Sequence, residues 1–104
     1  MSQAIVILTT ASSKEEGTVI AKVLVQEQLA ACVNIIDTIH SFYMFEGSYC
    51  EDEEVQLMIK TSEENFEAVE QMIKELHSYK VPEIIALPIV QGSKDYMLWL
   101  QENC

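Results

Sequence analysis

The sequence contains no arginine, and acidic residues far outnumber its lysines. Among 104 residues, 17 are Asp or Glu and 6 are Lys, which gives a formal net charge of −11. A nucleic-acid-binding protein needs a basic patch to meet the phosphate backbone, and this composition offers none. Anionic membrane surfaces would repel the chain for the same reason. Small cations are the partners that this charge favours.

Cysteines and long apolar runs are also scarce. Cys32, Cys50 and Cys104 form an odd set without CxxC spacing, which is typical of free thiols in a reducing compartment. The apolar run Ala4–Leu8 is too short for a signal peptide, and no stretch approaches the ~18 residues of a membrane span. We therefore expect a cytoplasmic protein with one domain over residues 1–104.

Catalytic and cofactor motifs are missing. The 3 glycines form no phosphate-binding loop, and neither a nucleophile elbow nor HExxH occurs. No organic cofactor is evident. A lysine near carboxylates can act as an acid or a base, and a cleft could be lined by Lys60, Tyr79, Glu83 and Trp99. Because nothing in their spacing forces that geometry, we expect a protein that is not an enzyme.

The most informative stretch that is present runs from Ala30 to Thr61 and folds back at Glu46-Gly47-Ser48. β-branched and aromatic residues dominate both arms, and the glycine lies where a hairpin turn requires positive φ. Two arms of about 13 residues make a ribbon about 40 Å long, whereas a compact domain of this size is about 34 Å across.

Such a ribbon extends beyond its own domain. An exposed apolar edge aggregates unless it is paired, so we expect neighbouring subunits to cover it. The alternative is a bulge near Asp37-Thr38 that divides the first arm into two ordinary strands of a monomer.

The other segments alternate between short strands and amphipathic helices. Ala4–Leu8 and Ile84–Leu87 are apolar enough for strands, and Pro88 indicates a strand end or a sheet edge. Two capping boxes, Ser13-Lys14-Glu15-Glu16 and Thr61-Ser62-Glu63-Glu64, each predict the start of a helix.

Apolar residues at helical spacing mark one face of each helix. They are Gly17, Ile20, Ala21 and Leu24 in the first helix, Phe66, Val69, Ile73 and Leu76 in the second, and Tyr96, Trp99 and Leu100 in a short C-terminal helix. The order strand, helix, hairpin, helix, strand predicts an α+β, ferredoxin-like split βαβ sandwich with both main helices on one face of an antiparallel sheet.

Five segments resemble the CutA family of divalent-cation tolerance proteins. They are Leu29-Ala30-Ala31-Cys32-Val33-Asn34-Ile35, Ser41-Phe42-Tyr43-Met44-Phe45-Glu46-Gly47, Glu54-Val55-Gln56-Leu57-Met58-Ile59-Lys60-Thr61, His77-Ser78-Tyr79-Lys80-Val81-Pro82-Glu83 and Asp95-Tyr96-Met97-Leu98-Trp99-Leu100. The resemblance implies a tight homotrimer whose hairpins pair across subunits. It also implies a role in the response to copper and other divalent metals, with direct metal binding in some members.

Three positions depart from the family pattern. Thr9 replaces a cysteine that some bacterial members carry, and Leu76 with His77 replaces two adjacent histidines. Phe45 replaces a common tryptophan. A copper site built on that cysteine and the paired histidines cannot be carried over whole, because only His77 remains.

His77 is thus the best single candidate for a metal ligand, because imidazole suits copper, zinc and nickel. It shares a loop with Tyr79 and Glu83. The alternative is a helix-terminal cap favoured by the helix dipole. His40 is expected to be an exposed or interface strand residue, and Cys32 a small buried hydrophobe.

Two hypotheses for the function follow. The first is a cytoplasmic homotrimer that binds divalent cations, copper foremost, weakly and without redox turnover. The second is a trimeric signalling or scaffold module, similar in fold to the PII-type nitrogen regulators. It would bind a small effector or a partner protein in intersubunit clefts, with Lys60 and Lys80 as anion-reading groups.

Overall fold

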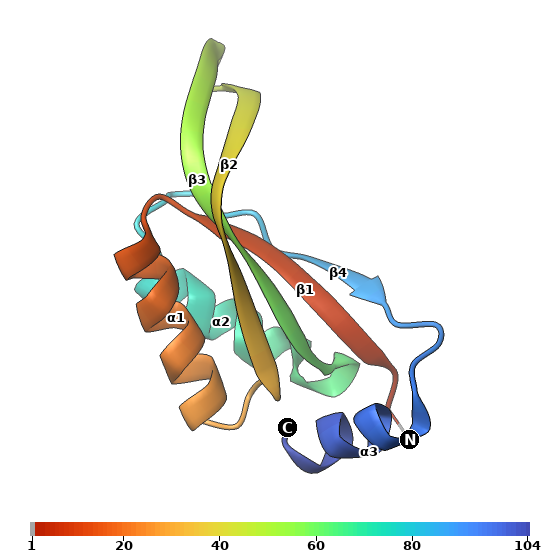
Figure 1. Cartoon of the computed structure of the whole chain (residues 1–104). Helices are drawn as coiled ribbons and strands as arrows, with labels where there is room; N and C mark the ends of the chain where they lie inside the picture. Colours follow the sequence, from red (N-terminus) through yellow and green to blue (C-terminus); the bar gives the residue numbers. More distant parts are fainter. Residues whose placement is uncertain (1) are drawn as a thin grey trace.

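The computed structural model describes residues 2–104 as a single antiparallel sheet with its helices packed around it (Figure 1). The elements in order are β1 (Ala4–Ala11), α1 (Lys14–Gln26), β2 (Cys32–Phe45), β3 (Ser48–Ser62), the 3-10 turn η1 (Glu63–Asn65), α2 (Phe66–Leu76), β4 (Ile85–Pro88) and α3 (Lys94–Glu102). The sheet order is β2-β3-β1-β4, with α1 and α2 against one face. The predicted ferredoxin-like arrangement is confirmed, and β4 lies at a sheet edge as Pro88 indicated.

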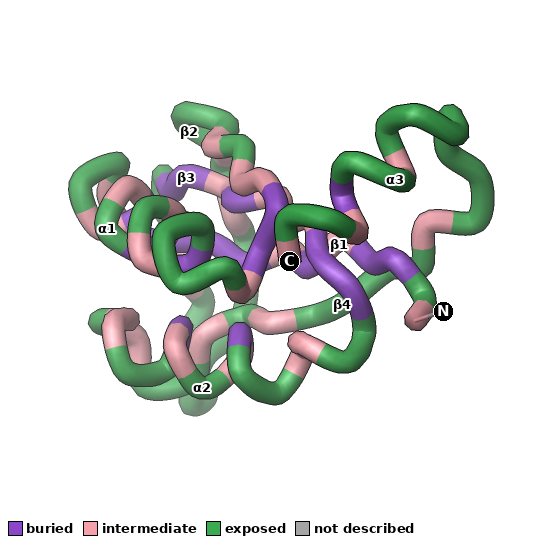
Figure 2. The backbone as a smooth tube through the Cα atoms, turned by 90° about the horizontal axis from the view of Figure 1, so that it is seen from below, coloured by how far each residue is buried: buried purple, intermediate pink, exposed green. Residues whose placement is uncertain are grey.

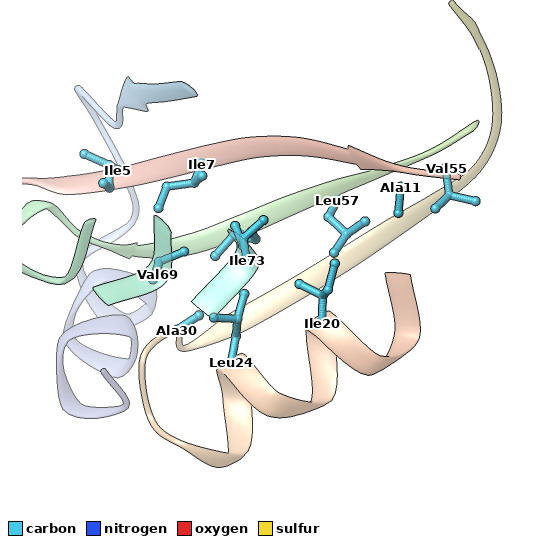
Figure 3. Packing of buried hydrophobic residues seen from close by; sticks show 11 residues of the cluster. Ile5, Ile7, Ala11, Ile20, Leu24, Ala30, Val55, Leu57, Val69 and Ile73 are labelled. Atoms are coloured by element: carbon cyan, nitrogen blue, oxygen red, sulfur yellow. The ribbon is translucent and has the colours of Figure 1, made fainter. Parts of the chain in front are cut away.

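The main core lies between the sheet and the two long helices (Figure 3). Alternate residues of β1 and β3 face this core, where Ile7 is paired with Ile59. The helices contribute their predicted faces, with Ile20 and Leu24 from α1 and Val69 and Ile73 from α2 completely buried. The apolar periodicity of the sequence therefore located the core.

Gly17 allows α1 to approach the sheet closely. A Cβ atom there would lie 3.1 Å from Cγ2 of Val55 and 3.3 Å from Cδ1 of Leu57. Both distances are shorter than ordinary van der Waals contact between carbon atoms.

The opposite face of the sheet is covered at one end only. There, Leu100 of α3 packs with Ala4 and Ala31. The predicted face of this helix is correct for Leu100 alone, because Tyr96 and Trp99 are exposed. The tube in Figure 2 shows α3 largely in the exposed colour, unlike the inner strands. Among the described helices, none is both long and apolar enough to cross a lipid bilayer.

The hairpin of β2 and β3 extends well beyond the rest of the fold (Figure 1). The molecule measures 44 × 25 × 23 Å, in agreement with the predicted overhang. The turn has positive φ at Glu46 (49°) and Gly47 (82°). A bulge does lie between Ile36 and Ile39, with φ of 55° at Thr38, but pairing continues on both sides of it.

The two predicted capping boxes have different outcomes. Ser13 caps α1 by accepting a hydrogen bond from the Glu16 N–H at 3.1 Å. The second box is wrong, because β3 continues through Ser62 and η1 precedes α2. Thr61 donates instead from Oγ1 to the Leu29 carbonyl at 2.7 Å and accepts from Asn65 Nδ2 at 3.2 Å. A contact between residues 32 positions apart has displaced a local cap.

Candidate functional site

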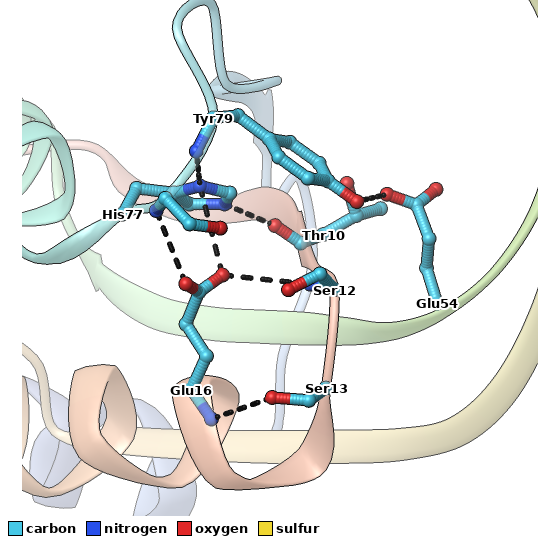
Figure 4. A network of polar contacts seen from close by, with 8 residues as sticks. Thr10, Ser12, Ser13, Glu16, Glu54, His77 and Tyr79 are labelled. Carbon is cyan, nitrogen blue, oxygen red and sulfur yellow. Dashed lines mark hydrogen bonds and ion pairs between the residues drawn. The ribbon is translucent and has the colours of Figure 1, made fainter.

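His77 lies where α2 ends, and its side chain turns inward with no solvent-exposed surface. Its ring Nε2 donates to the Thr10 carbonyl oxygen at 2.6 Å, because a carbonyl can only accept (Figure 4). Its Nδ1 accepts from the Tyr79 N–H at 3.0 Å. Both ring nitrogens are therefore occupied by backbone groups.

The carboxylate of Glu16 links the start of α1 to the loop after α2. Its Oε2 accepts from the Ser78 N–H at 3.1 Å, and its Oε1 accepts from the Ser12 N–H at 3.4 Å. Oε1 also lies 3.7 Å from His77 Nδ1, beyond hydrogen-bond distance. The spacing predicted only a local cap, but Glu16 also binds the backbone of the loop after α2.

These contacts support the structural alternative for His77. A metal at Nδ1 would have to displace the Tyr79 N–H, and a metal at Nε2 would have to displace a proton held by Thr10. The residues around the ring, in this arrangement, do not fit a resident metal ion. Metal binding through His77 stays a prediction.

Tyr79 forms the second part of this network. Its hydroxyl donates to Glu54 Oε2 at 2.6 Å, and its ring lies 4.7 Å from the His77 ring between centroids. Burial, and next the hydrogen bond to Glu54, raise the pKa of Tyr79 above its usual value. Glu54 is itself only 6% exposed.

A second tyrosine–carboxylate pair lies beside the first. Tyr43 donates its hydroxyl to Asp52 Oδ2, and this hydrogen bond is the largest cause that raises the pKa of Tyr43 to about 12. Asp52 and Glu54 are two residues apart on β3, so their side chains leave the strand on the same side. The sequence-based prediction included neither Tyr43 nor Glu54 as a site residue. The spacing of Asp52 and Glu54 by two positions in a strand could have indicated that both carboxylates lie on one face.

Tyr79, Glu54 and Tyr43 line a groove of about 630 Å³ between the outer hairpin and the loop after α2. Its lining consists of Thr10, Ser41, Phe42, Tyr43, Phe45, Glu54, Ser78, Tyr79, Lys80, Val81 and Glu83. Of the predicted cleft residues, Tyr79 and Glu83 lie here. Trp99 lies on α3 and Lys60 on β3, where Lys60 Nζ is 5.9 Å from the centre of the Tyr96 ring. The rings of Tyr96 and Trp99 lie 5.5 Å apart between centroids and are tilted by 37°.

The other candidate ligands do not come together. His40 is exposed on β2 opposite Glu53, and the three cysteines are free and partly buried at separate places. Within residues 2–104, no group of three or more His, Cys, Asp or Glu side chains is arranged to hold a metal ion.

Comparison with known proteins gives the chain its relatives. Residues 5–103 match the family model described as CutA1 divalent ion tolerance protein. The chain is 47% identical over 98 residues to the divalent-cation tolerance protein CutA of Thermus thermophilus, covering 94% of this chain and 95% of the relative. It is 43% identical to a chloroplastic CutA protein of Arabidopsis thaliana, spanning 95% of this chain but 54% of that one.

A solved structure has the same fold. The structure described as the periplasmic divalent cation tolerance protein CutA from Archaeoglobus fulgidus superposes with a TM-score of 0.93 at 41% identity. The match covers 96% of this chain and 97% of that one. The similarity therefore includes the long hairpin and the terminal helix.

Proposed function

Because the chain belongs to the CutA1 family of divalent ion tolerance proteins, we propose that it acts in divalent-cation tolerance as a cytoplasmic homotrimer. The observation that supports the assembly is that the single subunit exposes apolar side chains to solvent. On the overhanging hairpin, Phe42 and Met44 are each 64% exposed and Tyr49 is 62% exposed. Ile85 and Leu87 are exposed on the edge strand β4. Exposed apolar strands of this kind need a partner in solution.

Sedimentation equilibrium tests the assembly. We expect a mass three times the 11.8 kDa of one chain, and no folded monomer on dilution. Met44→Glu should weaken the trimer, because it places a charge in the proposed contact. Val19→Glu is the matched control, since Val19 is exposed on α1, away from the hairpin. A stable folded monomer of the native chain would contradict the proposal.

The second part of the proposal is that the protein binds divalent cations, copper foremost, weakly and without catalytic turnover. The net charge of −11 supports it, because it raises the local concentration of cations. Equilibrium dialysis with copper(II) at neutral pH, with all cysteines blocked, would measure binding by the native protein and by His77→Ala. If circular dichroism shows the variant folded and it binds about one copper per chain fewer than the native protein, His77 is a ligand. Equal binding by both proteins would exclude it.

The alternative function is a PII-like module that holds a small effector or partner protein. The groove beside Tyr79 and Glu83 favours it, because about 630 Å³ is a typical volume for a small-molecule site. Native mass spectrometry of protein purified from its source would reveal a co-purifying organic ligand. Fractionation of the same cells would test the cytoplasmic location, which the periplasmic and chloroplastic relatives do not share by name.

A further inference from the structure

Glu54 is a buried carboxylate that forms no ion pair within residues 2–104. The ion pairs formed within residues 2–104 use other acids: Asp37, Glu70, Glu16 and Glu46. The hydrogen bond that Glu54 receives comes from the neutral Tyr79 hydroxyl. An ionised carboxylate can accept about four hydrogen bonds, and a buried one is costly unless it is paired. Glu54 therefore has acceptor sites left for a cation from outside the described residues.

The surroundings of Glu54 show which kind of cation would fit. The aromatic residues Tyr43, Phe45 and Tyr79 line the same groove. Aromatic faces attract ammonium groups, whereas they offer no ligand atom to a metal ion. Lys80, the one cationic side chain in this lining, directs its Nζ to Glu46 at 3.5 Å. The groove therefore combines one buried carboxylate with a lining rich in aromatic residues.

We propose that this groove binds an organic ammonium ion that carries an apolar group. The ammonium would donate to the free lone pairs of Glu54, and the apolar group would lie against Tyr43 and Phe45. Tyr79 holds the carboxylate in place from the side of the loop. This activity goes beyond the role in divalent-cation tolerance and does not require copper binding. It also differs from the predicted anion-reading role of Lys80, because the groove would select positive charge.

Isothermal titration calorimetry on the assembled native protein tests the proposal at neutral pH. The probes are 2-phenylethylammonium and its neutral counterpart 2-phenylethanol. We expect one amine per chain, bound about tenfold or more tightly than the alcohol, since hydrogen bonds to charged groups are the stronger ones. Equal affinities, or no binding of the amine at millimolar concentration, would overturn the proposal.

Two variants locate the binding. Glu54→Gln keeps an acceptor for Tyr79 but removes the charge, so the preference for the amine should disappear. Glu51→Gln is the matched control, because it removes the same charge from the same strand at a position outside the groove. An equal loss in both variants would show that the amine senses only the overall acidity, which also overturns the proposal.

A further measurement serves if Glu54→Gln does not fold. On the native protein, the amine should shift the ring resonances of Tyr43 and Tyr79 in NMR spectra, and the alcohol should shift them far less at the same concentration. Shifts confined to the opposite side of the hairpin, around His40 and Glu53, would place the amine elsewhere and contradict the proposal. The trimer and copper experiments are separate from these. If either gave a negative result, the amine titrations would still test the groove.

Discussion

The ring Nε2 of His77 donates to the carbonyl oxygen of Thr10 over 2.6 Å and connects residues 67 positions apart in the chain. This contact joins the residue after α2 to the end of strand β1, just before α1 begins. The Tyr79 N–H completes the arrangement at the other ring nitrogen. The imidazole thus serves as hydrogen-bond partner for one backbone group of each of these two segments.

His77→Ala should lower the free energy of unfolding by about 2–4 kcal/mol, because it removes a buried ring and two hydrogen bonds. Urea unfolding at a fixed protein concentration measures the change. His40→Ala is the matched control, since His40 is exposed and should change the stability by no more than about 0.5 kcal/mol. Equal effects of the two substitutions would contradict the structural role of His77.

Two buried threonines should respond to valine with opposite signs. Thr9 is completely buried and its hydroxyl has no hydrogen-bond partner within residues 2–104. Thr9→Val should therefore stabilise the protein by about 1 kcal/mol. Thr61→Val should destabilise it by about 1–3 kcal/mol, because it removes the shorter hydrogen bond to the Leu29 carbonyl, leaving the 3.5 Å bond from Asn65 Nδ2, and also removes an acceptor of Asn65. Thermal unfolding of both variants checks the pair, and a shared sign would refute the assignment of their hydrogen bonds.

Gly17→Ala should destabilise the protein by about 1 kcal/mol, although alanine is the better helix former by about that amount. The reason is the short distance from the added methyl group to Val55 and Leu57, both of which are buried. Relieving it requires α1 to move away from the sheet. Chemical denaturation gives the change in free energy, and a more stable variant would show that the sheet side chains adjust freely.

Stability should fall as the pH rises above about 10, the ordinary pKa of a tyrosine. The pKa of Tyr43 is raised to about 12 by its hydrogen bond to Asp52, and burial raises that of Tyr79. Between about pH 10 and 12 the unfolded chain has lost these protons while the folded chain keeps them, so deprotonation favours unfolding.

Urea midpoints measured across that range test the effect. The contribution of Tyr43 is fully present below pH 10 and is lost as the pH rises to about 12, whereas that of Tyr79 only begins to fall above pH 10. The double variant Tyr43→Phe with Tyr79→Phe should show a shallower decline than the native protein. An identical pH slope in both proteins would mean that neither phenol proton is held by the fold.

The sequence predicted features that depend on local chemistry. Ser13 and Gly47 each perform the role that their position and residue type indicated. Features that depend on distant partners were missed. Thr61 bonds to Leu29 rather than capping a helix, and Tyr96 is exposed because α3 meets the sheet through Leu100.

The candidate site shows the same limit. His77 and its loop were found from residue type and from family resemblance, but Glu16 and Glu54 became site residues only through contacts across 62 and 25 positions. No periodicity within one element contains that information. The bulge at Thr38 was anticipated, yet its effect on pairing depended on the partner strand.

The division of β3 has a consequence for hydrogen exchange. Its part from Val55 to Lys60 lies between β1 and β2, whereas residues 48–54 pair with β2 alone. A two-stranded ribbon is marginal in water, so amide protons of the outer part should exchange through local opening wherever no partner covers it. Those of the inner part should require global unfolding. Any partner that binds the outer ribbon would slow its exchange, so the amide protons of this half of the strand report assembly.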